Sequence, residues 1–165
     1  IKKLFYIHPS KIPASSANSL HAVRMCQAFS KQGFSTVLIA PGTNFCNKKK
    51  IGALKKYYGG KFQFKVCLSP TLIQGLNFLM FIAYATFLMI KDKKNKLVVT
   101  RSIHVAYISS LLGKRTIFES HSPVFQYSKN QFLFLKLLSK KQKFIKLIVI
   151  SKELKKVYKT IFPNL

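Results

Sequence analysis

The residues best placed to do chemistry in this sequence are an acid and a histidine two positions apart, Glu119 and His121. They follow Thr116–Phe118, a short apolar run that predicts a buried strand. In sheets of parallel strands, the side chains at the carboxyl ends of the strands face the ligand crevice. An imidazole at such a point can hydrogen-bond a substrate hydroxyl, and that bond can strengthen as charge develops. The alternative is a loop histidine that is hydrogen-bonded for structural reasons only.

The other acidic residues are weaker candidates, and the chain has only three carboxylates in all. Asp92 lies in a run of lysines, where a solvated ion pair is expected. Glu153 lies in the first turn of a predicted helix, where the helix dipole favours an acid. Chemistry that needs two facing carboxylates is therefore not supported.

The remaining histidines are spread along the chain. His8 ends the first predicted strand, where it either lines the crevice or is structural, and His21 is expected only to support the neighbouring loop. His104 follows Arg101 and Ser102 near the start of a helix, and these three are candidate substrate contacts. Four histidines without close spacing, and three cysteines without a C-x-x-C pair, predict no metal site.

The opening of the chain predicts the element that positions His8. An apolar strand, Leu4–Ile7, is followed by a loop, an amphipathic helix from Ser19 and a second strand, Thr36–Ala40. The loop contains Ser15, Ser16, Ala17 and Asn18, small residues at the carboxyl end of a strand, where such folds bind ligands. It has no glycine, which weakens the expectation of close phosphate contact. No G-x-G-x-x-G or Walker pattern is present, so neither an NAD nor an ATP site is supported.

The rest of the chain alternates between further apolar strands and helices. Strands are expected at Phe62–Leu68, Leu97–Thr100, Thr116–Phe118 and Leu147–Ile150, and helices at Ile51–Tyr58, Ile103–Leu112, Asn130–Lys143 and after Ser151. This alternation predicts an α/β fold with a Rossmann-like, doubly wound, mainly parallel sheet and helices on both faces. The 165 residues suffice for one such domain, spanning 1–165, and not for two.

The segment Thr71–Ile90 is apolar enough to allow three interpretations. Its twenty residues match a bilayer core in length, so a single membrane span is possible. Gln74, Gly75 and Asn77 in its first two turns argue against a span. A helix packed on the sheet is favoured, ahead of a helix lying on a membrane surface.

The net charge of +26 limits the possible partners. Such a charge is typical of proteins that bind nucleic acid or anionic membranes, but it also arises from a generally lysine-rich surface. Only three basic residues are arginine, which disfavours base-specific readout of nucleic acid. An odd number of cysteines and the lack of a secretory signal predict a cytoplasmic protein, with peripheral attachment to the inner face of the cell membrane as a possibility.

Several pieces, in order, resemble the N-terminal acceptor-binding domain of glycosyltransferase family 4, one half of a GT-B enzyme. They are Tyr6–His8, Pro13–Asn18, His21–Phe29, Gly33–Pro41, Tyr57–Gly59, Val98–Ser102, Ile117–His121 and Ile148–Leu154. Phe34 stands where that family often has histidine. No single piece is specific for the family, but together the pieces occur in the family's order and extend over nearly the whole chain.

The resemblance implies a retaining hexosyltransferase that moves a sugar from a nucleotide-sugar donor to a glycan or lipid-linked acceptor, with no other cofactor. It places His121, supported by Glu119, near the donor sugar and the acceptor. In the family, the main donor contacts lie in a second, C-terminal domain, so this chain alone is expected to be inactive. The alternative is a non-enzymatic protein with a Rossmann-like core that binds a membrane surface or nucleic acid.

Overall fold

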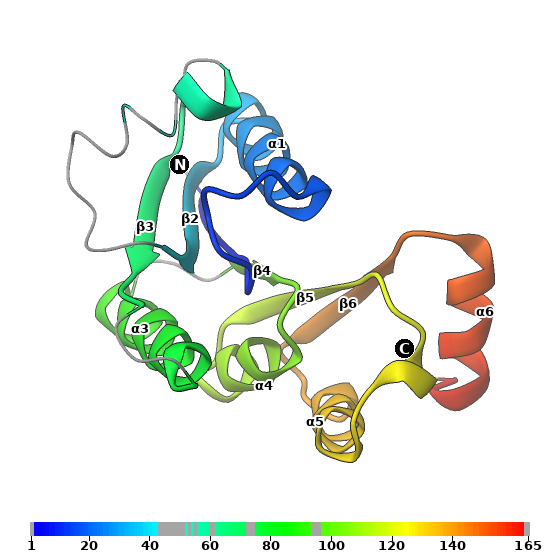
Figure 1. The fold of residues 1–165 in the computed structure, drawn as a ribbon. Coiled ribbons are helices and arrows are strands. Elements are labelled where there is room, and N and C mark those ends of the chain that lie inside the picture. Colours follow the sequence, from blue (N-terminus) through cyan, green and yellow to red (C-terminus); the bar gives the residue numbers. More distant parts are fainter. Residues whose placement is uncertain are drawn as a thin grey trace.

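Six strands form a single sheet in the order β3-β2-β1-β4-β5-β6, and all five strand pairs are parallel (Figure 1). This is a computed structural model, and it describes residues 2–42, 52, 54, 56–59, 62–71, 75–93 and 97–163. The strands are β1 (Lys3–Ile7), β2 (Ser35–Pro41), β3 (Lys65–Ser69), β4 (Leu97–Thr100), β5 (Arg115–Ser120) and β6 (Phe144–Val149). The helices are α1 (Ala17–Lys31), α3 (Asn77–Lys91), α4 (Ile103–Leu111), α5 (Lys129–Ser139) and α6 (Lys152–Ile161), with a 3₁₀ turn at Val124–Gln126. The sheet is Rossmann-like, and the predicted fold class is confirmed.

The central strand β1 explains why its sequence is apolar without alternation. Leu4 and Tyr6 pack in a core cluster that contains residues of α1. Phe5 and Ile7 point the other way, into a cluster formed with α3 and α4. A strand covered on both faces buries every side chain, so a continuous apolar run is required.

Helix α1 has a boundary signal in the sequence at each end. The side chain of Ser16 caps the amino end by accepting a hydrogen bond from the backbone N–H of Ser19. At the other end, Gly33 has a φ of 83°, a left-handed conformation that glycine adopts without steric cost. The helix therefore starts two residues before the position expected from Ser19.

Helix α3 is shorter than the twenty-residue segment that the sequence suggested. It begins at Asn77, after Gly75 with a φ of 88°, and spans fifteen residues. Phe81, Ala85 and Met89 are fully buried against the sheet, which agrees with the favoured interpretation of this segment. Its opposite face leaves large apolar side chains exposed, namely Leu79, Phe87 and Ile90. Among the helices that the structure describes, none combines the length and the apolar character needed to cross a bilayer.

The carboxyl-terminal elements form a third cluster around Phe118, Leu135 and Tyr158. Here the expectation of helices covering both faces holds less well, because β6 is a sheet edge and Ile145 and Ile148 on it are exposed. In Figure 1, α5 and α6 lie beside this end of the sheet.

Several predicted boundaries were wrong by a few residues. The strand expected from Phe62 begins at Lys65, because the rings of Phe62 and Phe64 stack on each other, with centroids 4.7 Å apart, and pack against the core. The helix expected over Asn130–Lys143 ends at Ser139. Strand β6 begins three residues before the predicted Leu147, since Phe144 already pairs with Thr116 of β5. The helix expected at Ile51–Tyr58 lies partly outside the described residues.

Candidate functional site

The candidate site lies at the carboxyl ends of β1, β4 and β5. The order of the strands reverses between β1 and β4, and in open α/β sheets the crevice at such a reversal binds ligands. His8 follows β1, Arg101 follows β4, and Glu119 lies near the end of β5. Parallel pairing brings these three sequence regions to one edge of the sheet.

Glu119 is the centre of a group of polar side chains, which we call the Glu119 cluster: Tyr6, His21, Arg101, Glu119 and His121. The Tyr6 hydroxyl donates to Oε2 of Glu119 at 2.9 Å. Nε2 of His121 lies 2.6 Å from Oε1, and Nε2 of His21 lies 3.0 Å from the same oxygen. Nε of Arg101 is 3.8 Å from it. Glu119 is only 6% exposed, so four polar partners surround a nearly buried carboxylate.

These partners determine the charge of Glu119. Burial alone would raise the pKa of its carboxyl group, but hydrogen bonds from His121 and Tyr6 and the charge of Arg101 outweigh burial. The pKa of Glu119 therefore lies below its ordinary value, and the group is ionised at neutral pH. Burial, followed by the charge of Glu119, raises the pKa of the Tyr6 hydroxyl, which stays protonated as a hydrogen-bond donor.

His8 is a second polar feature of this edge. It is 1% exposed, and neither ring nitrogen has a hydrogen-bond partner among the residues that the structure describes. Burial, reinforced by the charge of Arg101, lowers the pKa of His8 to about 4. The ring is therefore neutral at physiological pH.

A hollow of about 210 Å³ opens beside the cluster. Its lining includes His8, Asn18, Arg101, Glu119 and His121. The structure thus brings together both predicted catalytic residues and three of the predicted substrate contacts.

The loop before α1 contributes less than the sequence suggested. Ser16 uses its hydroxyl as the helix cap, and Ser15 and Ala17 are exposed. Asn18, which the structure places in the first turn of α1, reaches the cluster, where its Oδ1 accepts a hydrogen bond from Nη1 of Arg101 at 3.4 Å.

Ser102 and His104 also have positions that local structure explains. The Ser102 side chain is buried and caps α4, accepting from the backbone N–H of Val105. The His104 ring packs edge-on against Phe78 and Phe134, and burial lowers its pKa. Both line a separate hollow of about 130 Å³, which Arg101 shares with the larger one.

Two members of the cluster were missed by sequence reasoning. His21 was expected only to support the loop, yet it contacts an acid 98 residues away. Tyr6 looked like an ordinary core residue of an apolar strand. No local spacing could have identified either contact, because both depend on how α1, β1 and β5 pack.

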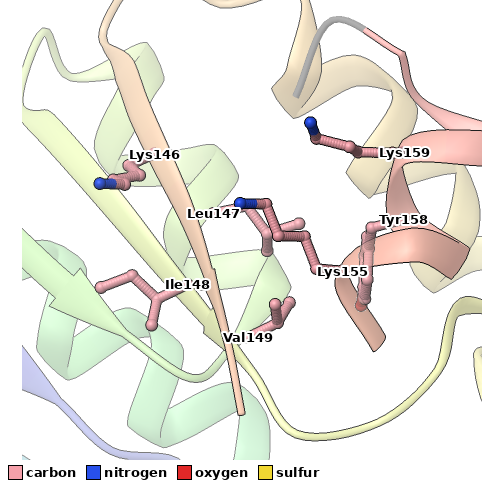
Figure 2. A pocket seen from close by; sticks show the side chains of 7 residues that line it. All are labelled: Lys146, Leu147, Ile148, Val149, Lys155, Tyr158 and Lys159. Atoms are coloured by element: carbon pink, nitrogen blue, oxygen red, sulfur yellow. The ribbon is translucent and has the colours of Figure 1, made fainter. Parts of the chain in front are cut away.

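A larger hollow of about 410 Å³ lies between β6 and α6 (Figure 2). Lys155, Tyr158 and Lys159 of α6 face Leu147 and Val149 of β6 there, whereas the side chains of Lys146 and Ile148 point to the other side of the strand. The described residues that line it include neither a carboxylate nor an imidazole. Glu119 and His121 line the hollow of about 210 Å³ instead.

No protein-family model matches this sequence, and no curated protein matches it. The solved structures that are similar to this chain include two plant UGT proteins. One is the apo UGT2 of Phytolacca americana, with 17% identity and a TM-score of 0.47 over 74% of this chain and 30% of that chain. The other is a UGT transferase from Siraitia grosvenorii in complex with UDP, with 10% identity and a TM-score of 0.48 over 74% of this chain and 29% of that one. The chain thus spans less than a third of the length of either, and similarity at this level says nothing about substrate or mechanism.

Proposed function

We propose that this chain is the acceptor-binding domain of a retaining glycosyltransferase of the family 4 kind, which moves a sugar from a nucleotide-sugar donor to a glycan or lipid-linked acceptor. The observation that carries the proposal is the Glu119 cluster, which lies beside a hollow at the ligand-binding edge of a doubly wound sheet. Three of the sequence pieces that resemble that family, Tyr6–His8, Val98–Ser102 and Ile117–His121, contain the carboxyl ends of β1, β4 and β5 at this edge.

His121 is the residue best suited to contact the reacting sugars. With Nε2 donating to ionised Glu119, its Nδ1 is left to hydrogen-bond a sugar hydroxyl. The 2.6 Å contact with Glu119 fixes the orientation of the His121 ring, so Nδ1 is positioned for the sugar before the reaction begins. Hydrogen bonds to sugar hydroxyls that strengthen in the transition state can supply several kcal/mol.

The number of carboxylates supports a binding role for this half of the enzyme. Asp92 pairs with Lys3 at the opposite end of β1, at 2.9 Å, and Glu153 lies in the exposed first turn of α6. Glu119 is therefore the one acid of this chain in the cluster. The donor sugar and the groups that hold its diphosphate are expected from a second domain.

The acceptor proposed is one presented at an anionic membrane surface. Arg101, with Asn18, adds a positively charged wall to the hollow, which suits sugar hydroxyls or a phosphate of a lipid-linked glycan. The high positive charge of the chain and the exposed apolar face of α3 favour the same location.

The proposal is tested first by acceptor binding to this chain. Free and lipid-linked oligosaccharides are titrated into protein labelled at its histidine rings. We expect NMR shifts at His121 and His21 and none at His104, whose ring packs between aromatic side chains. No shift at His121 or His21 would contradict the proposal.

The second test is kinetic and uses this chain joined to a donor-binding domain. His121→Ala should lower kcat about 10²–10³-fold, the cost of losing one preorganised hydrogen-bond partner at a reacting centre. The melting temperature should fall only slightly, because His121 is partly exposed and Tyr6 and His21 still bind Glu119. His104→Ala is the matched control. A normal kcat with a melt lowered by several degrees would make His121 structural.

The chain alone should turn over no nucleotide sugar, because both walls of the cleft are needed to position the reactants.

A further inference from the structure

We propose that His21, Glu119 and His121 form a binding site for a divalent transition-metal ion of the zinc type. Each residue offers one ligand atom, and the three atoms lie within 4.8 Å of one another. The proposal does not rest on glycosyl transfer, because metal binding is measured without donor or acceptor.

The donor set suits such an ion. Two imidazole nitrogens and one carboxylate oxygen form a set that binds Zn²⁺ with a fourth, open position. In tetrahedral zinc sites, bond lengths near 2.1 Å separate neighbouring ligand atoms by about 3.3 Å. The carboxylate oxygen here lies 3.0 Å from one imidazole nitrogen and 2.6 Å from the other. Small rotations of the side chains therefore suffice to admit an ion.

The surroundings allow that movement and hold the carboxylate in place. The side chains of His21 and His121 are 40% and 28% exposed, so both rings can adjust, whereas Glu119 is nearly buried. Tyr6 donates to Oε2 and leaves Oε1 facing the imidazoles. Such a supporting hydrogen bond orients a metal-binding carboxylate. The fourth position would open toward the hollow that Glu119 and His121 line.

Arg101 opposes the ion. Its Nε lies 3.8 Å from Oε1, and a second positive charge near this oxygen weakens the attraction for a cation. This repulsion distinguishes the site from histidines that bind metal nonspecifically, because removing Arg101 should tighten a cation bound at Oε1.

An ion at Nε2 would also change what His121 offers a substrate. The ring proton moves to Nδ1, so Nδ1 donates a hydrogen bond where it otherwise accepts one. Nε2 of His121 can therefore either bind the ion or donate a hydrogen bond to Glu119, but it cannot do both at once.

The test measures binding of Zn²⁺ to the metal-free chain by calorimetry, and of Co²⁺ by absorption spectroscopy. We expect one ion per chain and a cobalt d–d spectrum of a low-coordinate site. His21→Ala and His121→Ala should each weaken binding by at least about 100-fold, the upper end of what loss of a supporting partner costs. Tyr6→Phe should weaken it about 10-fold. Arg101→Met should tighten it, and His104→Ala should change nothing.

Zinc should also raise the melting temperature of the wild-type chain by mass action, and not that of the two histidine variants. If His21→Ala does not fold, His21→Gln serves instead. The proposal is overturned if wild-type protein binds neither ion, or if both histidine variants bind as the wild type does. A sulfur-to-cobalt charge-transfer band would likewise overturn it, because it would assign the ion to cysteine.

Discussion

At the scale of single residues, His8 is unusual because its polar ring is buried and has no hydrogen-bond partner in the described part of the chain. A neutral imidazole in this position costs less than a charged one, which is why its pKa falls. The residue that follows β1 therefore links the stability of the fold to pH.

We expect the chain to lose about 3 kcal/mol of unfolding free energy as the pH falls from 7 to about 4, through His8 alone. The folded pKa is about 4 and the unfolded value is 6.5, so the unfolded chain binds the proton first. Stability is therefore full above pH 6.5 and falls through the window between the two values. Urea unfolding at a series of pH values measures this.

His8→Leu is the matched variant, since it fills the same site without titrating. Its unfolding free energy should lack the decline between pH 6.5 and about 4 that His8 causes. An identical pH profile in both proteins would show that His8 does not titrate as its burial implies.

Some residues of the candidate site could be predicted from the sequence, and others could not. Glu119 and His121 could be identified, because a strand end in a parallel sheet has a known relation to the ligand crevice. His21 could not, because a histidine on a helix looks the same whether it faces solvent or a distant carboxylate. Ser16 and Ser102 are helix caps in the structure, a role that serine at such positions commonly has, and their predicted contacts with substrate stay predictions.

At the scale of elements, strands buried on both faces were the most predictable. β4 matches its predicted bounds at both ends, since its apolar run has no ambiguity. β3 and α3 were less predictable. Before β3, the stacked rings of Phe62 and Phe64 give the alternating apolar pattern of a strand, although the strand begins only at Lys65. Before α3, Gly75 has a left-handed conformation, and the helix begins two residues later.

Helix α3 offers a matched pair of phenylalanines for testing its packing. Phe81 is fully buried and Phe87 is 56% exposed. We expect Phe81→Ala to lower the unfolding free energy by about 3–5 kcal/mol, because it leaves a cavity against the sheet. Phe87→Ala should cost less than about 0.5 kcal/mol. Equal losses in chemical denaturation would mean that α3 presents a different face to the sheet.

At the scale of the whole molecule, the doubly wound class could be predicted from alternating apolar strands and helices. The strand order β3-β2-β1-β4-β5-β6 could not, because strand pairing is nonlocal and each apolar strand could pair with several others. It is this order that brings Tyr6 and Glu119, 113 residues apart, into contact. The candidate site is therefore a consequence of topology more than of any motif.

The net charge of +26 should attract the whole molecule to anionic membranes. We expect the chain to bind anionic phospholipid vesicles and not neutral ones, because each lysine near an anionic surface contributes about 1 kcal/mol. Raising the salt from 0.1 M to 1 M shortens the screening length from about 10 Å to about 3 Å, so binding in a flotation assay should be lost. Binding that persists in high salt would contradict this electrostatic mechanism and implicate the exposed apolar face of α3. Leu79→Ser, a change at a 61% exposed position on that face, should then abolish the residual binding.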